Sequence, residues 1–185
     1  LHIYQPPTQK EIWVRRITKE SYRKLFSGFL NIPNCRLTLN INSVLCELLE
    51  KWGGEDVIRD IKELVKRGSI ELTGSAKYHA FLPLIPEEEI ERQIRLNEEG
   101  LDKYFGPYWK KNGFFSPEMA YSDKVAQVAK KMGYKWIVID EMSFPVSLAS
   151  RRSGPAGGPS EKKYQPDRIY EMDGLDDFGV FFRER

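Results

Sequence analysis

The chain has 185 residues, which is enough for one domain with a sizeable hydrophobic core. Its 29 basic and 27 acidic residues give a net charge of +2, and this balance argues against a dedicated nucleic-acid-binding protein. No stretch approaches the roughly 18 uninterrupted apolar residues of a membrane-spanning helix.

The two cysteines, Cys35 and Cys46, form no CxxC pair, which argues against a zinc or redox motif. We expect two free thiols, which fits a reducing interior, and therefore a cytoplasmic protein. The chain begins without a methionine and inside a predicted strand, so we expect further residues before Leu1. The sequence contains no signal for an oligomeric state.

The first predicted strand covers residues 1–5, and the prolines that follow it end it because proline has no N–H to donate. A second strand is predicted at residues 36–42. Ser43 is then the expected N-cap of a helix whose apolar residues share one face. A further helix follows Gly53-Gly54, and Gly68 is its expected end.

A short strand is predicted at residues 69–74, followed by a proline-containing loop at 78–86. Pro86 is the expected first residue of a long helix that reaches about Tyr104. The three glutamates at 87–89 suit the positive end of the helix dipole, so this acidic run indicates a helix start and not a binding patch.

Further strands are predicted at residues 113–117 and 136–140. Between them, Ser122 is the expected N-cap of a helix that Gly133 ends. The run WIVID at 136–140 is almost wholly apolar, which is typical of a strand buried on both faces of a parallel sheet.

Two more strands are predicted near residues 168–172 and 179–183, after a segment at 147–166 rich in Gly, Pro, Ser and charge. That segment is predicted to be a flexible loop. Strands that alternate with helices indicate an α/β domain with a parallel sheet, and we expect residues 1–185 to belong to a single domain.

In parallel α/β folds the functional site lies at the carboxyl ends of the strands, so the polar residues near those ends are the candidates. They are His2, Tyr4 and Gln5 after the first strand, Glu71, Tyr78 and His79 at the third, Ser116 and Glu118 at the fourth, and Asp140 and Glu141 at the fifth.

The two histidines of the chain, His2 and His79, both fall at such strand ends. Each alone is better explained as a hydrogen-bonded structural histidine. Together with carboxylates at three of the strand ends they indicate a site, because converging polar groups are costly unless paired or functional. His2 and Tyr4 are two residues apart in a strand and therefore point to one face.

The motifs of several site types are missing from the sequence. There is no HExxH, HxxxH, P-loop, GxGxxG or GxSxG, so no metal or cofactor is indicated. Carboxylates, an amide, imidazoles and aromatic rings together are typical of a sugar site. Two carboxylates about 5 Å apart would give retaining glycoside hydrolysis.

Three stretches, HIYQPP, IELTGSAKYHAFLPLI and GFFSPEMAYS, resemble in order and spacing the conserved regions of glycoside hydrolase family 57. RLTLNINSVLCELLEKWG and WIVIDE resemble further parts of that family, and the similarity covers most of residues 1–141. The family comprises α-glucan-active enzymes: α-amylases, amylopullulanases, 4-α-glucanotransferases and branching enzymes. The resemblance implies an incomplete, TIM-like (β/α)7 barrel, a retaining mechanism and an α-glucan substrate.

The same resemblance implies roles for individual residues. Glu118 matches the catalytic nucleophile, and Glu71 matches a glutamate of the sugar site. His2 and Gln5 match the HxHQP signature, in which Tyr4 replaces the second histidine. His79 is expected to line the same pocket. Asp140 is explained equally as a residue at the edge of the site or as a helix cap.

A larger departure concerns the acid/base, which in this family is an aspartate in a conserved region well beyond the nucleophile. VFFRER at 180–185 resembles the strand before that region, so we expect this chain to be the N-terminal part of the catalytic barrel and inactive alone. The aspartates Asp173, Asp176 and Asp177 match no motif and are explained as turn residues.

Two alternatives remain. The first is a metal-dependent polysaccharide deacetylase on a related barrel, although the histidine spacing does not match one. The second is a carbohydrate-binding remnant without turnover. The sequence does not separate hydrolysis, transfer and branching.

Overall fold

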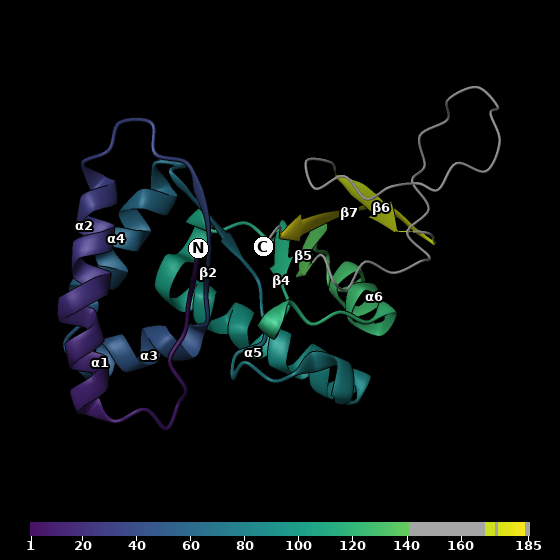
Figure 1. The fold of residues 1–185 in the computed structure, drawn as a ribbon, viewed down its shortest axis with the longest axis horizontal. Helices are drawn as coiled ribbons and strands as arrows, with labels where there is room; N and C mark the ends of the chain where they lie inside the picture. Colours follow the sequence, from purple (N-terminus) through teal and green to yellow (C-terminus); the bar gives the residue numbers. More distant parts are fainter. Residues whose placement is uncertain (141–168, 173, 184–185) are drawn as a thin grey trace.

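The fold was analysed in a computed structural model of the chain, which describes residues 1–140, 169–172 and 174–183 (Figure 1). The predicted loop at 147–166 and Glu141 lie outside these residues. None of the helices in the described ranges is both long and apolar enough to cross a membrane.

The strands form two sheets. The first has the order β1-β2-β3, with all strands parallel, and the second has the order β4-β5-β7-β6. A parallel bridge between Gly74 and Phe114 connects β3 to β4. The strands are β1 (His2–Ile3), β2 (Leu37–Ile41), β3 (Ile70–Thr73), β4 (Gly113–Phe115), β5 (Trp136–Asp140), β6 (Tyr170–Met172) and β7 (Leu175–Arg183).

All seven predicted strands are present, and the parallel prediction is confirmed for β1 to β5 and β7. It is wrong for β6, which pairs antiparallel with β7. β7 begins at Leu175 and not near residue 179, because the turn at Gly174 joins β6 and β7 directly. The described strands form two bridged sheets, so the (β/α)7 barrel stays a prediction.

A long helix near the N-terminus was not predicted. It consists of α1 (Glu11–Ile17), a π-helical segment at Thr18–Tyr22, and α2 (Arg23–Leu30), without a break in helical backbone. Its side chains against the core come from Val14, Thr18, Tyr22 and Phe26. These residues are spaced by four, which is more than the 3.6 residues in one turn of an α-helix. The wider π-helical turn helps to keep them on one face of the helix.

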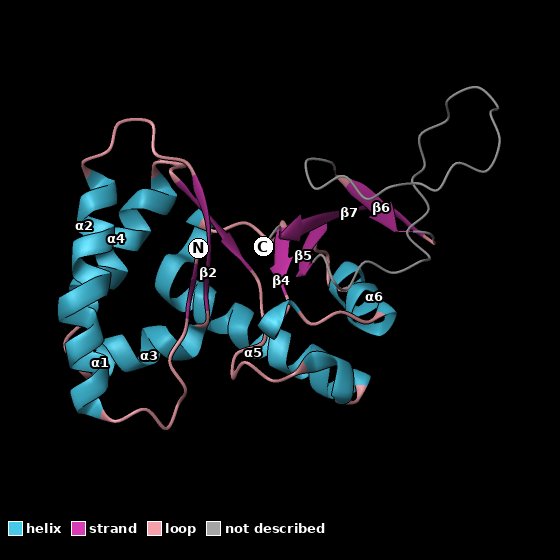
Figure 2. Ribbon diagram, in the orientation of Figure 1, coloured by secondary structure: helices cyan, strands magenta, loops and turns pink. Residues whose placement is uncertain are grey.

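The other helices are α3 (Ser43–Lys51), α4 (Glu55–Lys66), α5 (Glu87–Phe105) and α6 (Asp123–Lys131), and all four were predicted. In Figure 2, α5 runs below both sheets, and it contacts α3 and α4 on one side and α6 on the other. The helix α5 therefore packs against the helices beside the first sheet and against α6 beside the second.

Two predicted helix starts need correction. Asn42, and not Ser43, is the N-cap of α3, and Ser43 is its first residue, whose N–H donates to Asn97 Oδ1 at 2.8 Å. Pro86 has an extended backbone and precedes α5 as its N-cap. The cap at Ser122 is confirmed, since its hydroxyl accepts from the N–H of Val125 at 3.3 Å.

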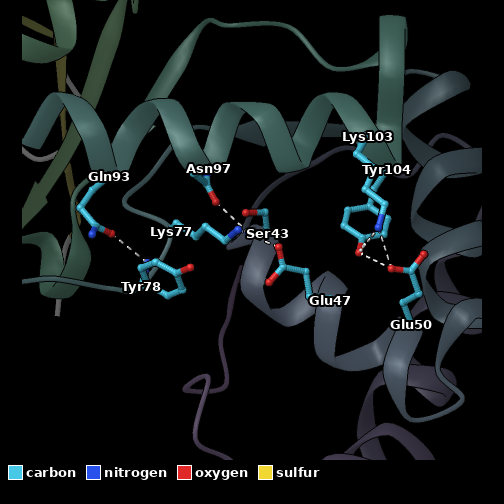
Figure 3. Close-up of polar contacts among 9 residues, drawn as sticks. All are labelled: Ser43, Glu47, Glu50, Lys77, Tyr78, Gln93, Asn97, Lys103 and Tyr104. Atoms are coloured by element: carbon cyan, nitrogen blue, oxygen red, sulfur yellow. Dashed lines mark hydrogen bonds and ion pairs between the residues drawn. The ribbon is translucent and has the colours of Figure 1, made fainter.

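The loop after β3 is fastened to α3 and α5 by polar contacts (Figure 3). Lys77, whose side chain is largely buried, pairs with Glu47 of α3 at 2.7 Å. The side-chain oxygen of Gln93 in α5 accepts from the backbone N–H of Tyr78 at 3.2 Å. The backbone carbonyl of Gln93 accepts from the backbone N–H of Lys77 at 3.1 Å. Further along, Glu50 accepts from Lys103 and Tyr104. The contacts of Lys77 and Tyr78 fix the residues that precede His79, whereas those of Glu50 join α3 to α5.

Candidate functional site

A line of polar side chains crosses the first sheet near the carboxyl ends of its strands. In the register of the sheet, His2 of β1 lies beside Asn40 of β2, which lies beside Thr73 of β3. Asn40 donates through Nδ2 to Thr73 Oγ1 at 3.0 Å, and its Oδ1 lies 2.7 Å from His2 Nδ1. Since an amide oxygen only accepts, this contact places the proton of neutral His2 on Nδ1.

Sequence reasoning missed Asn40 and Thr73, both of which are buried. A usable signal was present in the stretch LTLNIN, where Leu37, Leu39 and Ile41 alternate with polar residues. Strict alternation in a strand indicates one apolar and one polar face, and in a strand covered by helices the polar face is the inner one.

Three aromatic side chains gather around His79, which lies in the loop after β3. The Tyr4 ring stacks on the His79 ring at 4.3 Å, and the His2 ring lies 5.2 Å from it. Phe115 of β4 extends the group, because its ring stacks on the His2 ring with the ring centres 5.0 Å apart. The two histidines and Tyr4, predicted to share a site, are therefore brought together.

Glu118 joins this cluster from the 3₁₀ turn at Pro117–Met119, which follows β4. Its Oε1 lies 3.7 Å from His79 Nδ1. The Glu118 side chain is 72% exposed, whereas that of His79 is only 10% exposed. A buried imidazole therefore lies beneath a carboxylate that faces outward.

The backbone of this turn is unusual. Glu118 and Met119 both have left-handed backbones, with φ values of 57° and 52°, although neither is glycine. The turn is held by the N–H of Met119 on the carbonyl of Ser116 at 2.8 Å, and both Ser116 and Pro117 are buried. Non-glycine residues in this region cost roughly 1–3 kcal/mol each and cluster at functional sites, so the strain supports a functional role for Glu118.

A cavity of about 620 Å³ lies next to the cluster, within the size range of small-molecule sites. It reaches from the first sheet across to β5 and β7. Its lining residues are Leu1, His2, Thr38, Asn40, Thr73, Phe115, Met119, Val138 and Arg183. The polar line across the first sheet thus forms one wall of this cavity.

The remaining predicted residues lie elsewhere. Gln5 donates to the hydroxyl of Tyr22 at 3.2 Å and accepts from Gln9 at 2.8 Å, so it faces the N-terminal helix. Asp140 is the last residue of β5 and lies beside Arg183 of β7 in the register, close to the cavity wall.

Glu71 is the second residue of β3, two positions before Thr73, and it accepts from Asn112 at 3.2 Å. It lines a separate cavity of about 460 Å³ with residues that include Tyr108 and Asn112. The structure therefore does not place Glu71 in the cluster around His79.

The surroundings of both histidines favour the neutral form. Burial lowers the pKa of His2 below its ordinary value, against the opposing effects of the Asn40 hydrogen bond and the Glu118 charge. Burial also lowers the pKa of His79, and the neighbouring His2 lowers it further, while Glu118 opposes both. Within the described ranges, no group of three or more His, Cys, Asp or Glu side chains is placed to hold a metal ion.

A known protein family and several known sequences are similar to this chain. The profile of glycosyl hydrolase family 57 matches residues 3–185. An α-amylase from Pyrococcus horikoshii is 26% identical over 144 residues, covering 78% of this chain and 22% of that protein. A 4-α-glucanotransferase from Thermococcus litoralis is 21% identical over 132 residues, covering 69% and 19%. The chain thus spans about a fifth of these relatives.

Solved structures share the fold over the whole chain. The 4-α-glucanotransferase from Thermococcus litoralis superposes with a TM-score of 0.80 at 22% identity, over 100% of this chain and 27% of that one. A family 57 branching enzyme from Thermococcus kodakaraensis, solved with glucose, gives a TM-score of 0.77 at 20% identity, over 100% and 46%.

Proposed function

This chain belongs to glycosyl hydrolase family 57, and from that premise we propose that it carries the nucleophile side of a retaining enzyme that hydrolyses or transfers α-glucan chains. The curated relatives are named α-amylase and 4-α-glucanotransferase, which supports α-glucans as the substrate class. The proposal concerns the full-length protein, since the chain covers only part of each relative.

The observation that carries the proposal is the position of Glu118. Its carboxylate projects from a strained turn at the carboxyl end of β4, beside His79 and near the cavity behind His2. An exposed carboxylate held in place by its backbone is suited to attack an anomeric carbon, because a nucleophile gains from fixed orientation.

In the proposed reaction, an oxygen of Glu118 bonds to the anomeric carbon as the bond to the leaving oxygen breaks. A general acid protonates the leaving oxygen. The same group then deprotonates water or an acceptor hydroxyl, whose oxygen attacks the anomeric carbon and releases the sugar from Glu118. The resemblance assigns this acid/base to an aspartate, and we propose that it lies outside residues 1–185. It would stand about 5–5.5 Å from the nucleophile, as retention requires.

Sugar contacts are proposed for the side chains clustered around His79 beside the cavity. His2 offers imidazole nitrogen to a hydroxyl, and Tyr4 offers both a hydroxyl and a ring face. Gln5, Glu71 and Asp140 stay sequence-based proposals for sugar contacts. For Gln5 and Glu71, the contacts to Tyr22 and Asn112 would have to be exchanged for the substrate.

The test is to incubate the full-length protein with maltoheptaose and with amylose and to separate the products by size. We expect shorter chains from hydrolysis, longer chains from transfer, or new α-1,6 branch points after debranching analysis. Binding of amylose without any product would favour the carbohydrate-binding alternative. Release of acetate from an acetylated polysaccharide, with α-glucans unchanged, would favour the deacetylase. Either result would overturn the proposal.

A further inference from the structure

We propose that His79 is a positioning residue for Glu118: its imidazole donates a hydrogen bond through Nδ1–H that holds the carboxylate aimed at the substrate. This inference rests on the proposed function and assigns His79 a role other than sugar binding. Its basis is the 3.7 Å approach of His79 Nδ1 to Glu118 Oε1, which a small rotation of the exposed Glu118 side chain brings within hydrogen-bond distance.

The protonation state follows from the surroundings of the ring. A carboxylate only accepts, so the nitrogen that faces it favours the proton. The other nitrogen, Nε2, is buried, and no group in the described part of the chain forms a hydrogen bond with it. A proton on Nε2 would be a buried donor without an acceptor, which costs roughly 1–3 kcal/mol. The geometry therefore selects the neutral Nδ1–H form.

The charged and titratable groups that face His79 are consistent with a neutral donor. His2 lies on one side, with ring centres 5.2 Å apart, and disfavours a second positive charge there. Tyr4 covers one ring face, and Glu118 is the anion that the ring faces. A neutral donor supplies a fixed dipole to the carboxylate.

The loop holds His79 firmly in place. His79 has a left-handed backbone, with φ of 57°, and its N–H donates to the Ala76 carbonyl at 3.3 Å. The preceding residues Lys77 and Tyr78 are both bonded to Gln93 of α5 (Figure 3). A ring that is buried, stacked and anchored in this way is suited to orient a neighbour.

Two variants of the full-length protein separate the hydrogen bond from the packing. His79→Asn keeps a side-chain donor near the position of Nδ1 and tolerates a left-handed backbone. His79→Phe keeps the ring that stacks on Tyr4 and removes the donor. Thermal unfolding of both variants checks that each is folded, and kcat and KM on maltoheptaose are then measured.

We expect His79→Phe to lower kcat by roughly 10–100-fold, the range of one hydrogen bond to a charged group, with KM little changed. His79→Asn should keep kcat within a few-fold of the wild type, because it keeps a donor near the carboxylate.

A wild-type kcat in His79→Phe would overturn the inference. So would a folded His79→Asn in which kcat falls by about 10-fold or more, the smallest loss expected for one hydrogen bond to a charged group; this arm decides alone if His79→Phe does not fold. A rise in KM with kcat unchanged would assign His79 to sugar binding instead. A wild-type protein without activity on α-glucans would defeat the proposed function itself, which keeps the two failures distinct.

Discussion

Replacement of Glu118 by alanine in the full-length protein is expected to lower α-glucan turnover by ~10⁴-fold or more, because it removes the nucleophile. Azide should restore part of the activity on an activated α-glucosyl substrate. It fits the space left by the carboxylate and attacks the anomeric carbon from the same side. The product should be the β-glycosyl azide, of inverted configuration, which proton NMR distinguishes from the α-anomer.

Glu99→Ala is the matched control, since Glu99 is an exposed glutamate of α5 on the surface of the same chain. It should keep wild-type turnover and show no response to azide. Unaltered activity of Glu118→Ala would contradict the assignment of the nucleophile. The deacetylase alternative would then be tested next.

Replacement of Gly74 by alanine is expected to destabilise the fold by about 3 kcal/mol, the upper end of the cost of overpacking a core. A Cβ at Gly74 would lie 2.0 Å from the hydroxyl oxygen of Tyr134. Tyr134 has no room to move, because it is buried and its hydroxyl donates to Glu98 at 2.8 Å. Circular dichroism during heating should show a lower Tm.

The position of Gly74 also connects this prediction to the site. Its N–H donates to the Gly113 carbonyl at 2.8 Å, and its carbonyl accepts from the N–H of Phe115 at 2.9 Å. The strand before Gly74 leads to His79, and the strand beside it leads to Glu118. A shift between the two strands would therefore separate those side chains, and we expect activity to fall at temperatures where the variant is still folded.

Gly28→Ala is the control for Gly74→Ala. Gly28 is exposed in α2, and a Cβ there would meet no atom within 4 Å. Alanine in a helix is favoured over glycine by roughly 0.5–1 kcal/mol, so this variant should raise Tm. Equal effects of the two substitutions would show that the close approach of Tyr134 to Gly74 does not limit stability.

The strands and four of the helices could be predicted because their apolar residues follow a clear period and Gly, Pro or Ser marks their ends. The N-terminal helix could not be predicted on this basis. Two of its four buried residues are Thr18 and Tyr22, while Ile12 and Trp13 are 68% and 46% exposed. Its apolar residues therefore mark the face that packs on the core only in part.

The candidate site was predicted in part. His2, Tyr4, His79 and Glu118 meet, because parallel strands bring their carboxyl ends to one edge. The order of residues alone does not show how far along its strand a side chain lies. Glu71 was therefore expected in the site, but it lies in β3 two residues before Thr73, which lines the cavity. The left-handed backbones of His79 and Glu118 also have no local signal, since neither position holds glycine or asparagine.

The central claim is that Glu118 forms a covalent bond to the sugar, and peptide mapping tests it most directly. The full-length protein is treated with a fluorinated α-glucosyl fluoride, whose intermediate breaks down slowly, and is then denatured, digested and analysed by mass spectrometry. We expect one glucosyl adduct, located on Glu118 in the peptide that contains Pro117 and Met119. An adduct on another carboxylate, such as Glu71 or Asp140, or an active protein that forms no adduct, would contradict it.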